Sequence, residues 1–214
     1  MENVALMRMA KESLKDKWGL AIGTFLVYAL IVGVLQFHNS FYSNMFGPNV
    51  FSSIGGFLGL IIGGPMTLGA AYFALAISRN QEARFEQLFK GFNNFATALG
   101  AYLLMSIFVF LWTLLLIIPG IIAALSYAMT FYIIADEPSI SIMDAINKSK
   151  KMMYGYKWKL FCLHLRFFGL AILCILTLGI GFLFLMPYMH ITFVKFYDDI
   201  NGKQAAAETV NADI

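Results

Sequence analysis

The residues whose types could do chemistry are few in this chain and far apart. Its three histidines, His38, His164 and His190, lie on three separate segments, and a metal site would need all of them to converge. The sequence contains no Gly-rich phosphate loop, no Cys-x-x-Cys and no His-Glu-x-x-His. A Ser-His-Asp arrangement has no local signature either. We therefore expect no metal, no cofactor and no enzymatic activity.

Two acidic pairs are better placed for a specific role. Asp136-Glu137 and Asp198-Asp199 each follow a long apolar run. The simplest interpretation is that they are the solvated ends of helices. Because the two pairs occupy equivalent positions, the alternative is that they bind a cation or a basic partner.

Arg166 is the only charged residue between positions 160 and 194. Ionisable groups inside apolar segments are costly, and they are functional candidates by default. Arg166 lies seven residues after Lys159, which is about 10 Å along a helix. At that depth it can serve as a membrane anchor by extending to the interface. The sharper hypothesis is that it contacts an acidic helix end or a lipid phosphate.

The segments that must position these residues are unusually apolar. Of the 214 residues, 60% are hydrophobic and 13% are charged, against about 25% charged in a typical soluble domain. No Asp, Glu, Lys or Arg occurs in 19–78 or in 91–135. The net charge of +3 is too small for a nucleic-acid partner, which needs a clustered basic face. The composition predicts an integral membrane protein.

The apolar runs predict the number of spans. A bilayer core of about 30 Å needs about 20 apolar residues of helix. Runs 18–37 and 51–77 each predict one span, whereas 95–135 and 160–196 are long enough for two. We predict an all-α membrane protein of about six transmembrane helices arranged as three hairpins, in a single domain over 1–200 with a cytoplasmic tail at 201–214. Because the returning runs are short, four helices plus two re-entrant segments is the alternative.

A threefold internal repeat underlies this plan, at about 4–79, 80–137 and 139–199. In the second and third units, amphipathic patterns at 85–90 and 141–153 predict short cytoplasmic elbow helices. We expect Ser141 to cap the later elbow and Asp144 to pair with Lys148. The basic residues fall in the elbows and near the chain ends, so the positive-inside rule places both termini in the cytoplasm.

Glycine and proline mark the positions where helices break or pack closely. Within 55–63, glycine recurs every fourth residue, and such a stripe favours close helix packing. A broken, flexible helix around 63–65, as transporters use beside their substrate sites, is the functional alternative. The tight turns of the two later hairpins are predicted at Pro119-Gly120 and around Gly181. The candidate positions for a helix break or close packing are Gly63, Gly64, Pro65, Pro119, Gly120, Gly179, Gly181 and Pro187.

Two classes of function fit the sequence. The first is a non-enzymatic accessory or scaffold component that handles lipids or amphipathic peptides, with membrane lipids, other membrane proteins or a second copy as partners. The second is a small transporter or channel for a neutral solute. No acidic residue lies at mid-span, so proton or sodium coupling is not expected. A polar path for a solute would be lined by Ser126, Tyr127, Thr130, Thr177 and Tyr188.

Three stretches carry a resemblance to a known family. They are LWTLLLIIPGII at 111–122, SYAM at 126–129 with ADEP at 135–138, and LTLGIG at 176–181 followed by Pro187-Tyr188. In this order they resemble the domain of unknown function 975 family of bacterial integral membrane proteins, over nearly the whole chain. The resemblance implies a multi-pass protein of the bacterial plasma membrane, mostly in Gram-positive species. It implies no activity and no catalytic residues.

Overall fold

A computed structural model describes residues 2–46, 50–177 and 179–212, with side chains described in 2–34, 56–177 and 179–203. In these residues every regular element is a helix. This confirms the all-α class. The helices in chain order are α1 Asn3–Ser13, α2 Trp18–Phe46, α3 Val50–Ser78, η1 Phe85–Phe92, α4 Phe95–Leu115, α5 Ile117–Tyr127, α6 Thr130–Asp136, α7 Ile142–Met152, α8 Lys157–Leu176 and α9 Phe182–Ala212.

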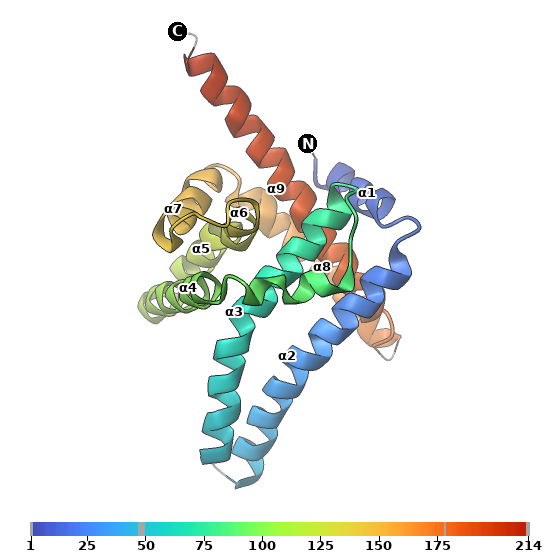
Figure 1. The fold of residues 1–214 in the computed structure, drawn as a ribbon, viewed down its shortest axis with the longest axis vertical. Helices are drawn as coiled ribbons and strands as arrows, with labels where there is room; N and C mark the ends of the chain where they lie inside the picture. The colour runs from blue at the N-terminus through green and yellow to red at the C-terminus, as the bar shows by residue number, and fades with distance from the viewer. Residues whose placement is uncertain (1, 47–49, 178, 213–214) are drawn as a thin grey trace.

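Short helices alternate with longer ones along the chain. Helix α1 precedes the α2–α3 hairpin, η1 precedes α4 and α5–α6, and α7 precedes α8–α9. Figure 1 shows α2 and α3 running together to one end of the molecule, while the C-terminal part of α9 projects from the opposite end. The predicted elbows at 85–90 and 141–153 are therefore confirmed as helices, η1 and α7.

Buried and exposed apolar side chains separate into two regions. We call the first region the base: it consists of the C-terminal half of α3, helix α6 and the middle of α9, where side chains such as Phe73, Ile133 and Phe196 are fully buried. We call the second region the tips: they are the α4–α5 and α8–α9 turns, where Leu114 and Leu176 are 74% and 77% exposed. The base holds the core, and the tips have apolar surfaces that this chain does not cover.

The alternative of a broken helix around 63–65 is wrong, because α3 runs through Gly63, Gly64 and Pro65 without interruption. These glycines instead allow neighbouring elements to approach. A Cβ on Gly64 would lie 2.6 Å from the carbonyl oxygen of Ala98 in α4, and one on Gly63 would lie 3.3 Å from the Tyr102 ring. Close packing is therefore the role that the structure supports for this segment.

The tightest approach in the described chain is that of η1 on α3. A Cβ on Gly69 would lie 1.7 Å from the Leu88 carbonyl oxygen, and one on Gly91 would lie 1.9 Å from the Pro65 carbonyl oxygen. No side chain larger than hydrogen fits at either position. The two backbones therefore touch, and η1 is part of the base.

The apolar side chains of η1 divide between the protein interior and its surface. Leu88 is fully buried, whereas Phe89 and Phe92 are exposed. The element is a 3₁₀-helix, in which residues three apart eclipse one another. Leu88 and Gly91 are accordingly its buried residues.

The turn between α4 and α5 also lies earlier than predicted. Leu116 is extended, with φ −163° and ψ 147°, and separates the two helices. Pro119 and Gly120 belong to the first turn of α5, where the missing proline N–H costs nothing. A Cβ on Gly120 would lie 2.1 Å from Thr113 Oγ1. Gly120 therefore closes the hairpin by packing, and the turn is made at Leu116.

The α8–α9 turn is built in a similar way. Gly179 has a φ of +85°, a conformation that favours glycine. A Cβ on Gly181 would lie 2.6 Å from Cys174 Sγ, so this glycine closes its hairpin as Gly120 does. Pro187 lies inside α9, which continues through it.

A break between α5 and α6 was not predicted. It leaves the Ser126 carbonyl and the Met129 N–H outside the helical bonding pattern. The Ser149 hydroxyl of α7 is fully buried and serves both groups, donating to the carbonyl at 2.8 Å and accepting from the N–H at 3.2 Å. The sequence sign of this contact is Ser149, which places a hydroxyl group on the apolar face of the amphipathic helix α7.

Four stretches of the described chain are long and apolar enough to cross a membrane: Gly56–Ser78, Phe95–Leu115, Ile117–Asp136 and Lys157–Leu176. Helix α1 and the part of α2 up to Val34 make a fifth only if this pair, bent by 103°, is counted as one span. Six was the predicted number. The returning helix α9 falls short because Lys195 follows after only thirteen uncharged residues of this helix, against about 20 apolar residues needed.

Candidate functional site

Arg79, the first charged residue after α3, joins the end of α6 to the middle of α9. Its guanidinium donates two parallel hydrogen bonds to Asp136 at the end of α6, at 2.7 and 2.8 Å. It also donates to Asp198 Oδ1 of α9 from Nη2, at 2.7 Å, and from Nε, at 3.2 Å. The planar fork of arginine suits such two-carboxylate binding. We call this cluster the charged junction.

The surroundings of the charged junction strengthen it. The Tyr197 hydroxyl donates to Asp136 Oδ2 at 2.9 Å, and its ring stacks on Tyr132. The hydrogen bonds from Arg79 to Asp136, and then to Asp198, raise the pKa of Arg79 further above its usual range even though burial opposes this. The arginine therefore stays charged and holds α3, α6 and α9 together at one point.

Asp199 forms a second ion cluster beside the first. Its side chain is 4% exposed and accepts hydrogen bonds from Lys159 and Lys203, each at 3.0 Å. Burial alone would raise the pKa of this carboxyl, but hydrogen bonds from basic groups, those of Lys203 and then Lys159 first among them, lower the pKa to about 2. The interpretation of Asp136, Asp198 and Asp199 as simply solvated helix ends is therefore wrong: they bind basic side chains of the same chain.

The expected Asp144–Lys148 pair does not form. Lys148 instead donates to Glu137, across the loop that precedes α7. Asp144 accepts a 2.6 Å hydrogen bond from the Ser141 hydroxyl, which in turn accepts from the Asp144 N–H at 3.2 Å. Ser141 is thus confirmed as the cap of α7. The loop turns back on itself and brings Glu137 within reach of Lys148, which the helix spacing alone does not show.

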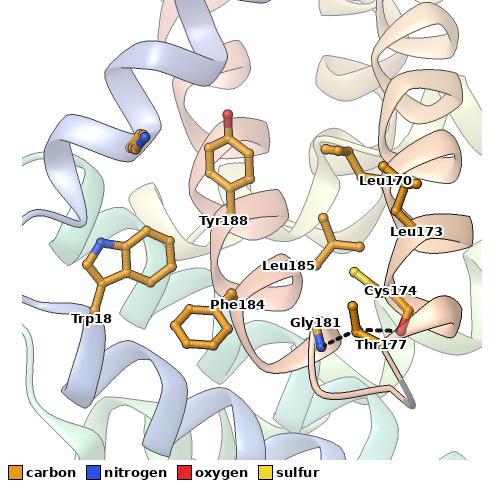
Figure 2. Close-up of a pocket in the computed structure, with 10 residues that line it drawn as sticks. Trp18, Leu170, Leu173, Cys174, Thr177, Gly181, Phe184, Leu185 and Tyr188 are labelled. Carbon is orange, nitrogen blue, oxygen red and sulfur yellow. Dashed lines mark hydrogen bonds between the residues drawn. The ribbon is translucent and has the colours of Figure 1, made fainter.

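Two grooves flank the α8–α9 hairpin. The first, groove A, has a volume of about 410 Å³ and lies between α8, α9 and the α1–α2 junction (Figure 2). Such a volume is in the range of small-molecule sites, about 300–1,000 Å³. Its walls are almost entirely apolar, formed mainly by Trp18, Leu170, Leu173, Cys174, Phe184 and Leu185.

The polar groups of groove A lie at its margins. Lys11 of α1 brings a charge to its lining, and Tyr188 brings a hydroxyl. In Figure 2 this hydroxyl points away from the Thr177–Gly181 turn that closes the other end. There the Thr177 hydroxyl donates to the Cys174 carbonyl oxygen at 2.8 Å and accepts from the Gly181 N–H at 3.2 Å. The polar groups at the turn end of groove A therefore bind one another, and the charge of Lys11 lies at its open end.

The second groove, groove B, lies along α8 and α9 with a volume of about 490 Å³. Its lining includes no lysine, arginine or carboxylate among the described side chains, and its polar member is His164. That ring stacks on Phe193 at 4.7 Å, and its Nδ1 lies 2.9 Å from the Leu160 carbonyl oxygen. The other residues that form groove B include Phe161, Leu165, Phe168, Ala171, Met186 and Met189.

Arg166 is exposed on α8. Among the side chains that the structure describes, no carboxylate forms an ion pair with it. The acidic helix ends that were its predicted partners are bound by Arg79, Lys159 and Lys203 instead. Contact with a lipid phosphate remains a prediction.

The five residues predicted to line a polar path do not face one common cavity. Thr177 and Tyr188 line groove A, whereas Ser126 and Thr130 are buried and donate to carbonyl oxygens of their own segment at 2.7 and 2.8 Å. Tyr127 contacts Phe108. A small polar cavity does occur elsewhere, about 60 Å³ between Tyr28, Thr67 and Tyr102. It was not predicted, and it has room for little more than water.

The two histidines whose side chains the structure describes do not converge. His190 is stacked on Phe25 at 4.5 Å, His164 lies in groove B, and the side chain of His38 is outside the described residues. No group of three or more metal-binding side chains gathers within the described part of the chain. Sequence reasoning missed Arg79, Lys11 and Trp18 as site residues. The signal for Arg79 was its position as the first charge after a long apolar run.

The fold and grooves define a class: an all-helical protein whose long apolar helices are compatible with membrane insertion. The sequence model of a family described as "Protein of unknown function (DUF975)" matches residues 1–130 and 113–204. The chain belongs to this family, as its motifs indicated. Comparisons with curated proteins and with solved structures find no match.

Proposed function

We propose that the protein is a non-enzymatic, multi-pass component of the bacterial plasma membrane that binds lipid in its lateral grooves. The observation that carries this proposal is the pair of open, apolar grooves beside α8–α9, about 410 and 490 Å³. A groove without polar partners suits a hydrocarbon chain, whose burial is favourable in proportion to its area. The described side chains offer no reactive constellation that would favour an enzyme.

The proposal includes six membrane crossings as three repeated hairpins with cytoplasmic ends. Hydrogen bonds between the charged segments support a common cytoplasmic side for them. The Asn3 side chain donates to the Lys159 carbonyl, and the Ser13 hydroxyl donates to the Ser78 carbonyl. The charged junction lies beside these contacts. The repeat is supported by the hairpin closures, in which Gly120 packs on Thr113 and Gly181 on Cys174. Both pairs are seven residues apart.

Cysteine labelling tests the topology. In a variant with Cys162 and Cys174 replaced by serine, a single cysteine at position 44 should react with an impermeant reagent in intact cells. A cysteine at position 151 should react only after the cells are broken. The reverse labelling pattern would mean that the orientation is inverted. Reaction of both cysteines in intact cells would contradict the proposed topology.

Lipid retention tests the function. The purified protein should retain phospholipid in native mass spectrometry, and a double variant that fills both grooves, Leu170→Trp with Ala171→Trp, should retain less. Leu114→Trp at the exposed α4 tip is the matched control and should retain as much as wild type. Equal retention by all three proteins would contradict lipid binding in the grooves.

A further inference from the structure

We propose that groove A selects an anionic phospholipid, with the phosphate held between Lys11 and Arg166 and an acyl chain lying along the α8–α9 wall. This inference rests on the proposed function and names the class of lipid. Its basis is the distribution of charge around the two grooves, which are otherwise alike in volume and lining.

Arg166 lies on the face of α8 that forms groove A. At about 100° per residue, positions 166, 170, 173 and 177 fall within about 60° of one another around the helix. Leu170, Leu173 and Thr177 all line groove A, so Arg166 continues their stripe. It lies four residues from Leu170, about 6 Å further along the axis. His164, which lines groove B, is about 200° away around the helix.

Lys11 approaches the same groove from the opposite wall. It belongs to α1 and contributes to the lining together with Trp18 of α2. Among the described side chains, no carboxylate forms an ion pair with Lys11 or with Arg166. Two cations without internal partners therefore flank an apolar groove, and the Tyr188 hydroxyl points away from the closed end.

An anionic phospholipid matches this arrangement in charge and in shape. Its phosphate can take two parallel hydrogen bonds from a guanidinium and an ion pair from a lysine. Its hydrocarbon chain can then follow the apolar wall toward the Thr177–Gly181 turn, where the polar groups already bind one another. Tryptophan favours the headgroup layer, and Trp18 lies at this site.

The distinction between the grooves makes the inference testable. Groove B has an apolar lining without a lysine or arginine among the described side chains. It should accept an acyl chain without preference for the headgroup charge. Groove A should prefer phosphatidylglycerol to phosphatidylcholine, because only the former has a net negative charge to complement Lys11 and Arg166.

The experiment is a native mass spectrometry titration of the full chain with phosphatidylglycerol and with phosphatidylcholine. Wild type should bind phosphatidylglycerol more tightly. Lys11→Gln and Arg166→Gln should each weaken phosphatidylglycerol binding about fivefold, the size expected of one exposed charge contact, and leave phosphatidylcholine binding unchanged. Arg166→Lys should fall between, because lysine keeps the charge and loses the two-bond geometry. Lys151→Gln, an exposed basic residue of α7, is the matched control.

The outcomes separate this inference from the function on which it rests. If wild type shows no preference, or if Lys11→Gln and Arg166→Gln keep the full preference, the anionic site in groove A is wrong. Lipid retention that still depends on filling the grooves would then leave the proposed function standing. If groove filling has no effect on either lipid, the proposed function fails as well.

Discussion

The base and the tips have the same apolar composition and opposite surroundings. Ile133 in α6 is fully buried, whereas Ile117 at the start of α5 is 71% exposed. The base is held by backbone contacts between η1 and α3, by buried side chains and by the charged junction. The tips have none of these and present leucine and isoleucine outward. The comparison teaches that one part of the chain is stabilised by its own packing and the other needs an apolar medium around it.

The largest effect should come from crowding the base. Gly69→Val should abolish the folded form, because even a Cβ would lie 1.7 Å from the Leu88 carbonyl oxygen and backbone atoms cannot yield. Gly59→Val is the control, since nothing lies within 4 Å of its added Cβ. Size-exclusion chromatography and thermal unfolding, both in detergent, measure whether each variant is folded and how stable it is. A stable, monodisperse Gly69→Val protein would contradict the contact between η1 and α3.

Truncating one isoleucine in each region compares them directly. Ile133→Ala should cost about 2–5 kcal/mol, as for buried aliphatic side chains that leave a cavity. Ile117→Ala should cost less than about 1 kcal/mol, because lipid or detergent contacts the side chain before and after the change. Thermal unfolding in detergent gives both values. Equal costs would mean that the tips are packed as tightly as the base.

The charged junction should contribute somewhat less. Arg79→Met removes charge-assisted hydrogen bonds to Asp136 and Asp198 and should cost about 1.5–3 kcal/mol. Arg84→Met is the matched control: Arg84 pairs with Glu82, but the two side chains are 66% and 76% exposed, and such pairs contribute about 0–1 kcal/mol. The same unfolding measurement tests the difference. An Arg79→Met variant as stable as wild type would show that α3, α6 and α9 stay packed without the arginine that they share.

The last prediction concerns the pH dependence that Asp199 gives to stability, which should be absent near neutrality. Its folded pKa is about 2, below the usual 3.8, so ionised Asp199 contributes about 2 kcal/mol that is fully present above pH 3.8 and is lost as the pH falls through about 2. Unfolding measured from pH 7 to pH 4.5 should therefore show no change from this group. Asp199→Asn should lower stability at pH 7 and reduce the loss below pH 4. A variant with an unchanged acid profile would contradict the role of Lys159 and Lys203.

Composition and periodicity were sufficient for much of the fold. The charge-free runs predict the long helices, and the amphipathic patterns predict η1 and α7 because those patterns depend only on local spacing. The cap by Ser141 was also predictable, since it involves residues three apart. The hairpin order follows from the same local signals.

The contacts between distant segments could not be predicted. Arg79 meets Asp136 and Asp198 only after three hairpins have packed, and no local pattern encodes that meeting. The turn at Leu116 was assigned to Pro119-Gly120 because proline and glycine mark both turns and helix starts. The grooves depend on the angle between α8, α9 and α2, which no spacing determines.

The charged junction also imposes an order on synthesis. Asp136 lies 57 residues after Arg79 along the chain, and Asp198 lies 119 residues after it. At about 5–20 residues per second, the ribosome delivers the second carboxylate several seconds after the first. During that interval Asp136 is the only one of the two carboxylates that has been made. The junction can therefore be completed only after the chain has been extended as far as α9.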